Sequence, residues 1–369
     1  MAKLKPINHT GTVRGVTLKM RSLYGKVSAI LDTVDFGGIW RGFSRVPFAL
    51  YNGERVFLRD EVIPYDRRFL GNTSIEYGGG YIAIWNVADP SGEDPELLAA
   101  DMVHEMFHAF QRQNGETRYP DDLLLLSYPD DEENYAVKYA ENLLLADVFD
   151  ESGLDAKKET LGRFLGARRY RESLVPNHIR QEYLTETIEG MAEYAGCMAL
   201  KFISAEKYKR RVAGYAEKLR TLDGSFFDIR RGLYNSGALL CLALRDTGAD
   251  FTHSVGKTER TLFDIAAGDT RPLPPTVDRS RAAAAAAEHI AAKKSMFEAF
   301  LSAHSGEVAG DWFICGYDPM NMVRLGDMLL CCHFVMLQGS GSEPPEFLQG
   351  PVLVKLKNGT ANRVEGYIA

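Results

Sequence analysis

Short apolar stretches alternate with Gly, Asn and Asp residues along the chain up to about residue 90. Residues 46–50, 55–58 and 81–85 are examples of these stretches. Brief apolar runs bounded by turn-forming residues are typical of β-strands. The pattern therefore predicts that residues 1–90 form a mainly β part of the protein.

Longer segments follow, in which apolar residues recur three and four positions apart, as they do on one face of a helix. The alanine run at 282–287 favours a helix by intrinsic propensity alone. The predicted helices are 95–113, 132–150, 155–165, 180–203, 205–221, 232–247 and 281–303. The middle of the chain, 91–270, is therefore predicted to be helical.

A Pro-rich segment at 271–277 cannot continue a helix and is expected to connect the helical middle to the last part of the chain. That part, 271–369, combines the alanine-rich helix with two predicted strands at 352–357 and 363–368. A β part, a helical part and a small mixed part in this order predict an α+β fold.

Composition and charge exclude several classes of protein. The chain has 369 residues, of which 45% are hydrophobic and 25% charged, as in ordinary globular proteins. Its formal net charge of −7 argues against nucleic acid as a partner. No window has the apolar length of a membrane span, and the N-terminus lacks the apolar stretch of a secretory signal. Five cysteines without zinc-knuckle spacing favour a reducing compartment, so we expect a cytoplasmic protein that binds no membrane.

The sharpest chemical signal is the segment His104-Glu105-Met106-Phe107-His108. Asp94 and Pro95 are suited to cap and begin the helix that contains it. Residues four apart share a helix face, so His104 and His108 can bind one zinc ion, with Glu105 near a zinc-bound water as general base. A catalytic zinc normally takes a third protein ligand.

Candidates for that ligand lie in the predicted helix 180–203. Its glutamates line one stripe: Glu182, Glu186, Glu189 and Glu193. Gly190 costs about 1 kcal/mol relative to Ala inside a helix, which favours a close approach by another backbone at this point. The alternative interpretation is a solvated acidic stripe.

The two segments together resemble the gluzincin zinc metallopeptidases, because HExxH is followed by Glu-Gly-x-Ala-x-Tyr at 189–194. The similarity is to the aminopeptidase and leukotriene-hydrolase branch and covers roughly residues 75–247. It implies a thermolysin-like zincin fold and a zinc ion held by His104, His108 and Glu189, with Glu105 as base. It also implies that Glu193 orients a ligand histidine.

A third segment, Tyr234-Asn235-Ser236-Gly237-Ala238, resembles the Tyr-x-x-Gly-Ala segment of the same branch. This likeness implies that Tyr234 donates a hydrogen bond to the developing oxyanion. Two features depart from the branch. The segment 109–180 separates the ligand helices and is expected to add at least two helices. Residues 78–86 resemble an edge strand beside the cleft but lack the glutamate that binds a substrate's free amine, so a free N-terminus is not expected to be required.

Other candidate groups have simpler explanations. Acidic residues within 121–133 suit helix starts and loops better than a site for a basic substrate. The segment 311–322, rich in aromatic and methionine residues, favours core packing over a substrate pocket. Cys331, Cys332 and His333 are expected to be buried filler.

These observations favour a hydrolase, specifically a zinc metallopeptidase, that binds one Zn²⁺ per chain and acts on a peptide or protein substrate. Two alternatives remain: a non-catalytic binding or regulatory protein with the zincin fold, and a zinc hydrolase of a non-peptide amide or an epoxide. An intact Glu105 argues against the first, because a fold kept only for binding needs no general base.

Overall fold

The computed structural model describes residues 9–341 and 344–369. It is a mixed α+β structure, which confirms the predicted fold class at this level. Two compact units make up the chain, and they do not follow the divisions near residues 90 and 270 expected from the sequence. The first unit runs to Arg118 and adds Thr187–Tyr215 and Gly237–Arg260; the second takes Tyr119–Glu186, Ala216–Ser236 and Thr261–Ala369. Among the described residues, none of the helices combines the length and hydrophobicity of a membrane span.

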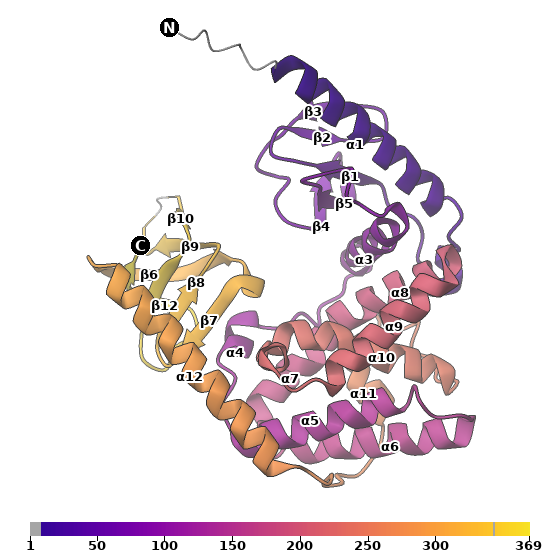
Figure 1. Ribbon diagram of the computed structural model, residues 1–369, viewed down its shortest axis with the longest axis vertical. Helices are drawn as coiled ribbons and strands as arrows, with labels where there is room; N and C mark the ends of the chain where they lie inside the picture. Colours follow the sequence, from indigo (N-terminus) through magenta and orange to yellow (C-terminus); the bar gives the residue numbers. More distant parts are fainter. Residues whose placement is uncertain (1–8, 342–343) are drawn as a thin grey trace, which may run out of the picture. The chain divides into compact units, whose positions relative to one another are not determined.

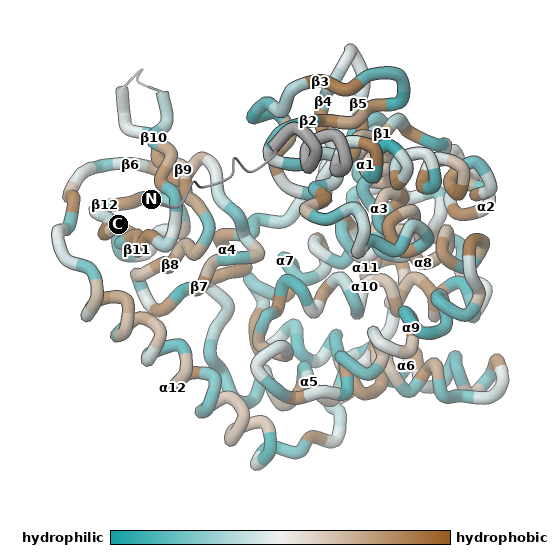
Figure 2. Tube along the Cα trace, turned by 45° about the horizontal axis from the view of Figure 1, so that its top comes forward, coloured by the Kyte–Doolittle hydropathy of each residue, from teal (hydrophilic) through white to brown (hydrophobic). Residues whose placement is uncertain are grey.

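The first unit contains a five-stranded sheet and the helix that carries the HExxH segment (Figure 1). The strand order is β3-β2-β1-β5-β4, with β1 parallel to β5 and the other pairs antiparallel. The strands are mainly hydrophobic segments joined by more hydrophilic loops (Figure 2). The elements are α1 (His9–Leu31), α2 (Phe36–Ile39), β1 (Phe48–Tyr51), β2 (Arg55–Phe57), β3 (Val62–Pro64), β4 (Thr73–Tyr77), β5 (Gly80–Asn86), α3 (Pro95–Gln113) and α8 (Met191–Ile203).

The strand at 78–86 is not at the edge of the sheet, which corrects the expectation from the sequence. β5 lies between β1 and β4, and β4 is the edge strand that packs, together with β5, against α3. The continuous buried run Ile82–Ile84 suits an internal strand. Gly78 and Gly79 both have positive φ and form the two-residue turn that returns the chain from β4 to β5.

A 23-residue helix, α1, begins the described chain, so the prediction of a mainly β part is wrong for this segment. Its buried side chains, Met20, Leu23, Val27 and Leu31, recur every three or four residues, as on one face of a helix. Polar and basic residues between them conceal this period when only continuous apolar runs are sought.

The helices predicted for the middle of the chain are confirmed, with shifted ends, except that the one predicted at 180–203 is divided into two α-helices. The segment between the helices of His108 and Glu189 contains α4–α7, so the expectation of at least two helices there is confirmed as well. The elements of the second unit in this region are α4 (Asp122–Leu126), α5 (Glu132–Asp147), α6 (Leu154–Arg171), α7 (Pro176–Thr185), a 3-10 turn (Gly224–Phe227) and α11 (Leu262–Ala267). α9 (Ala205–Arg220) and α10 (Ile229–Asp246) contribute residues to both units.

Buried ion pairs join α5, α6 and α7 within the second unit. Arg171 donates to Glu141 and Glu182 at 2.7–2.8 Å, and all three side chains are fully buried. Lys138 Nζ lies 2.6 Å from Glu182 Oε2. Arg168 forms ion pairs with Glu141 and with Glu186, which directly follows α7. Cations and carboxylates neutralise one another here, which is what makes charge burial tolerable.

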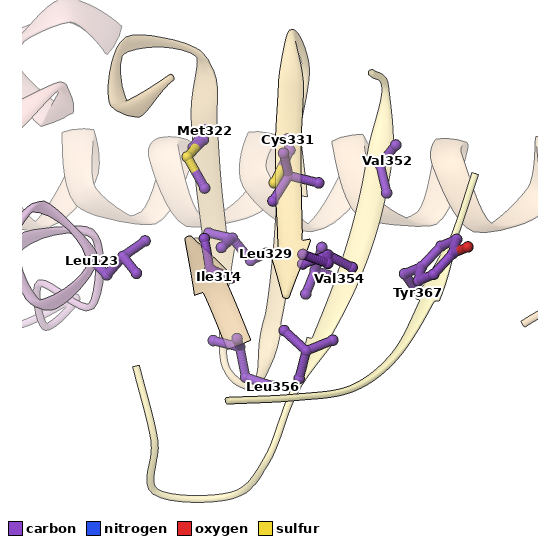
Figure 3. Close-up of a cluster of buried hydrophobic side chains, with 12 residues drawn as sticks. Leu123, Ile314, Met322, Leu329, Cys331, Val352, Val354, Leu356 and Tyr367 are labelled. Carbon is purple, nitrogen blue, oxygen red and sulfur yellow. The ribbon is translucent and has the colours of Figure 1, made fainter. Parts of the chain in front are cut away.

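The C-terminal sheet of the second unit is antiparallel, with the order β10-β9-β6-β12-β11-β8-β7. Its buried face includes Leu329, Val354 and Leu356, and Leu123 from α4 packs against the same cluster (Figure 3). The elements are α12 (Arg279–Ala303), β6 (Val308–Tyr317), a 3-10 turn (Pro319–Asn321), β7 (Met322–Leu325), β8 (Met328–Cys331), β9 (Phe334–Gly339), β10 (Glu346–Gln349), β11 (Val352–Leu356) and β12 (Arg363–Ile368).

Two further expectations about this part hold for only some of the residues concerned. Cys331 ends β8 and is buried, but Cys332 and His333 follow the strand and are exposed, so they are not buried filler. In 311–322, Ile314 and Met322 are core residues as favoured, while Met320 lines a surface pocket of about 370 Å³.

We predict that the ionic network makes the protein lose stability in acid. Burial alone would raise the pKa of Glu182, but Arg171 and Lys138 outweigh it and hold that pKa well below its usual range. Such a carboxylate stabilises the fold above its unfolded pKa, about 4.3, and this contribution is lost as the pH falls toward the folded value. Urea denaturation across a pH series should therefore show the free energy of unfolding decreasing below about pH 4.3.

The matched variant is Glu182→Gln, which cannot titrate. It should be less stable than the wild type at neutral pH by about 3–5 kcal/mol, because Arg171 loses a buried partner. Its free energy of unfolding should fall less steeply with acid. An equal slope in both proteins would assign acid unfolding to other carboxylates.

Candidate metal centre

The helix α3 begins where the sequence predicts. The Asp94 side chain accepts hydrogen bonds from the backbone N–H groups of Glu96 and Leu97 at 3.0 and 3.3 Å, and Pro95 occupies the first turn. His104 and His108 therefore lie well inside a regular helix, one turn apart. Both imidazoles point to the side of α3 that faces α8.

Glycines allow α8 and its neighbours to approach one another closely. A Cβ on Gly190 would lie 2.5 Å from the Cα of Gly237 in α10, which confirms the close crossing expected at this position. A Cβ on Gly196 would lie 2.9 Å from the carbonyl oxygen of Ala100, on α3 one turn before His104. No larger residue fits at either place without a backbone shift.

A π-turn, Glu186–Gly190, interrupts the helix predicted at 180–203 and separates α7 from α8. Such turns are rare in proteins, and those that occur are often found at functional sites. Glu182 and Glu186 belong to the ionic network of the second unit, whereas Glu189 and Glu193 face the histidines of α3. The side chains of Glu182 and Glu186 are fully buried and those of Glu189 and Glu193 are 11% and 16% exposed, so the solvated acidic stripe is ruled out.

Three ligand atoms converge at one point. His104 Nε2 and His108 Nε2 lie 3.0 Å apart, and Glu189 Oε2 lies 3.6 and 3.1 Å from them. A tetrahedral ion with bonds of 2.0–2.1 Å holds its ligand atoms about 3.3 Å apart. The group formed by these three residues can therefore hold one metal ion.

The proton on His104 is fixed by Glu193. His104 Nδ1 lies 2.8 Å from Glu193 Oε2. Burial raises the pKa of Glu193, but the hydrogen bond and charge of His104, aided by Arg211, bring it down to about 2. An ionised carboxylate only accepts hydrogen bonds, so Nδ1 carries the proton and the neutral imidazole presents the Nε2 lone pair to the cluster. This is the contact that the gluzincin resemblance implies for Glu193.

The proton on His108 is fixed by a residue that the sequence analysis missed. Gln111 Nε2 donates to the backbone carbonyl of Ile188 at 2.9 Å, and this contact sets the orientation of the amide. Gln111 Oε1 must then accept from His108 Nδ1, which lies 2.8 Å away. Both Nε2 atoms therefore carry lone pairs when the imidazoles are neutral, and a cation could bind between these two atoms, which lie 3.0 Å apart.

Acidic groups outnumber basic ones around these ligands. Burial raises the pKa of Glu105, against the opposing effect of the two histidines. Burial lowers the pKa of His104, but hydrogen bonds with Glu189 and Glu193 outweigh it and raise that pKa well above its usual value. The cluster thus favours positive charge, as a proton or as a metal ion.

A second layer of contacts from α9 supports Glu193. Tyr215 donates to Glu193 Oε1, and Arg211 bonds Asp101 Oδ1 at 2.8 Å while lying 3.9 Å from Glu193. No local pattern in the sequence points to Arg211 or Tyr215, because α9 reaches the site only through the tertiary fold. Asp101 and Gln111 lie one turn before His104 and one turn after His108, and this helical spacing is the signal that could have found them.

The remaining predicted site residue, Tyr234, belongs to the second unit. Its hydroxyl accepts a hydrogen bond from Arg230 Nη1 at 2.6 Å, and Arg230 Nε also donates to Asp122. Its role toward an oxyanion stays a prediction.

The acidic residues of 121–133 include the N-caps of α4 and α5, Asp121 and Asp131, as the helix-start interpretation predicts.

No family model, curated protein or solved structure matches the chain. The interpretation of the cluster therefore depends on its own geometry and chemistry.

We predict that Gly190→Ala destabilises the protein. The added Cβ meets the backbone of Gly237, so the crossing of α8 and α10 must open, at a cost of about 1–3 kcal/mol. Gly214→Ala is the matched control, because this α9 glycine is exposed and a Cβ there meets nothing within 4 Å. The control should gain up to about 1 kcal/mol. Urea denaturation compares the two, and a stable Gly190→Ala variant would refute the close crossing.

Proposed function

We propose that the protein is a zinc-dependent hydrolase of the gluzincin type that cleaves peptide bonds. The observation that carries the proposal is the convergence of His104 Nε2, His108 Nε2 and Glu189 Oε2, 3.0–3.6 Å apart. Two imidazoles and one carboxylate are a ligand set of catalytic zinc sites, which keep a fourth position for water or substrate. A mixed sheet followed by an HExxH helix and a glutamate-bearing helix also supports a thermolysin-like zincin fold for residues 75–247.

The local charge supports a divalent ion. Glu105, Glu189 and Glu193 lie in or beside the cluster, and Arg211, which lies near Glu193, is paired with Asp101. Buried negative charge in excess is costly unless a cation compensates it. Zinc fits this donor set better than calcium or magnesium, which prefer sites made of oxygen atoms alone.

Glu105 has the surroundings of a proton acceptor. It is 6% exposed, and no described residue donates a hydrogen bond to its carboxylate or forms an ion pair with it. A mostly buried carboxylate that accepts no hydrogen bond from the protein is available to bind water or substrate, which favours a role toward them. The raised pKa of Glu105, caused by burial, suits a group that takes up a proton and then gives it away.

The proposed chemistry divides between the metal and the chain. Bound zinc would polarise the scissile carbonyl and lower the pKa of a water molecule at its open position. Glu105 would accept the proton of that water and pass it to the leaving amine. Glu193 holds His104 in one tautomer, and Tyr234 would donate a hydrogen bond to the developing oxyanion.

Two other functions are compatible with the same fold. A non-catalytic binding protein would have no use for an unpartnered buried Glu105, so this observation favours an enzyme. Hydrolysis of a non-peptide amide or an epoxide would use the same metal and base. Profiling the zinc-loaded protein against a peptide library, with small amides and epoxides in parallel, separates these substrates.

The first prediction from this function concerns the metal. Metal analysis should find one zinc per chain, and Glu189→Ala should lose it because one of three ligands is gone. Glu193→Gln keeps all three ligands and should retain zinc with an affinity lowered about 10–100-fold. Full zinc content with unchanged affinity in Glu189→Ala would show that another group is the third ligand.

The second prediction concerns the base. Glu105→Gln preserves the volume of the side chain but cannot accept a proton. It should bind zinc as the wild type does and lose hydrolysis by about a hundredfold or more. Zinc content by metal analysis and turnover of the best library peptide test both halves. Undiminished turnover would remove Glu105 from the mechanism.

A further inference from the structure

We propose that Gln111 is a positioning residue for two of the proposed metal ligands: it holds the imidazole of His108 and the peptide group that precedes Glu189. The inference rests on the proposed function, because it assigns Gln111 to the same metal centre. Gln111 is fully buried on α3, one turn beyond His108. Its amide contacts one group on its own helix and one on the π-turn.

The first contact sets the proton of His108. Gln111 Oε1 accepts from His108 Nδ1 at 2.8 Å, which leaves Nε2 unprotonated and aimed at Glu189. Contacts of this kind fix both the tautomer and the ring orientation of a metal-binding histidine. Without the amide, His108 is able to place its proton on Nε2, where it would compete with the metal.

The second contact holds the segment that carries Glu189. Gln111 Nε2 donates at 2.9 Å to the carbonyl of Ile188, which belongs to the peptide group linking Ile188 to Glu189. This peptide group lies in the π-turn Glu186–Gly190, where the helical bonding pattern changes. A hydrogen bond at this point limits the rotation of the backbone that aims the Glu189 side chain.

A side-chain amide is suited to make both of these contacts. His108 Nδ1 requires an acceptor and the Ile188 carbonyl requires a donor, and a carboxamide supplies both from one planar group. A carboxylate, such as the one that Glu193 offers to His104, supplies only acceptors. Gln111 therefore links α3 to the π-turn in a way that Glu at this position cannot.

The experiment compares three variants of the full-length protein. Gln111→Leu removes both contacts, and Gln111→Glu keeps an acceptor for His108 but loses the donor to Ile188. Gln113→Leu makes the same chemical change at an exposed position two residues away and is the matched control. The zinc dissociation constant is measured by competition with a chromophoric chelator, and Co²⁺ absorption spectra report the ligand geometry.

We expect Gln111→Leu to weaken zinc binding about 10–100-fold, the range found for outer contacts of metal ligands. Gln111→Glu should bind zinc more weakly than the wild type but more tightly than Gln111→Leu, and both should alter the Co²⁺ spectrum. Gln113→Leu should match the wild type. Wild-type affinity and spectrum in Gln111→Leu would overturn the inference, as would equal losses in Gln113→Leu.

A second measurement separates this inference from the proposed function. ¹⁵N NMR of histidine in the metal-free protein reports which ring nitrogen of His108 carries the proton. We expect Nδ1 in the wild type and a change toward Nε2 in Gln111→Leu. If the wild-type protein binds no zinc, the proposed function fails while the tautomer result still decides the role of Gln111. An Nε2 proton on His108 in the wild type overturns the inference even if zinc binds.

Discussion

The close packing of α8 against α3 is the constraint on which the candidate metal centre depends. Gly196 lets α8 approach the backbone of α3 at Ala100, and Gly190 lets the start of α8 cross α10 at Gly237. These contacts bring Glu189 to within hydrogen-bond distance of His108, although the long segment 109–180 separates them in the chain. A side chain at either glycine would force the backbones apart, and the ligand atoms would no longer meet around one ion.

The π-turn determines which glutamates reach the candidate metal centre. On an uninterrupted helix, Glu182, Glu186, Glu189 and Glu193 share one stripe. The turn at Glu186–Gly190 changes the helical register, so that the first two residues join the arginines of the second unit and the last two face His104 and His108. A local irregularity of the backbone thus gives residues of one type two different surroundings.

Sequence patterns predicted the elements and ligands that depend on local spacing. The cap at Asp94, the helix of the HExxH segment and the close approach at Gly190 all follow from rules that act within a few residues. The helix α1 and the edge strand β4 were missed because their apolar residues are separated by polar ones. Arg211 and Tyr215 were missed for another reason: they reach Glu193 from a separate helix, and no local rule connects them to it.

Buried glutamates in the two units show why the metal centre differs from an ordinary ionic core. In the second unit, Glu141 and Glu182 each face arginine, and the pKa of both carboxyls is lowered because these cations outweigh the effect of burial. Around α3 the carboxylates of Glu189 and Glu193 face His104 and His108, and the pKa of Glu105 is raised by burial. In the first arrangement cations of the chain pair with the carboxylates, whereas in the second two imidazoles and a carboxylate direct their ligand atoms at one point. That difference in surroundings, more than the identity of the residues, is why the cluster of His104, His108 and Glu189 could hold a metal ion.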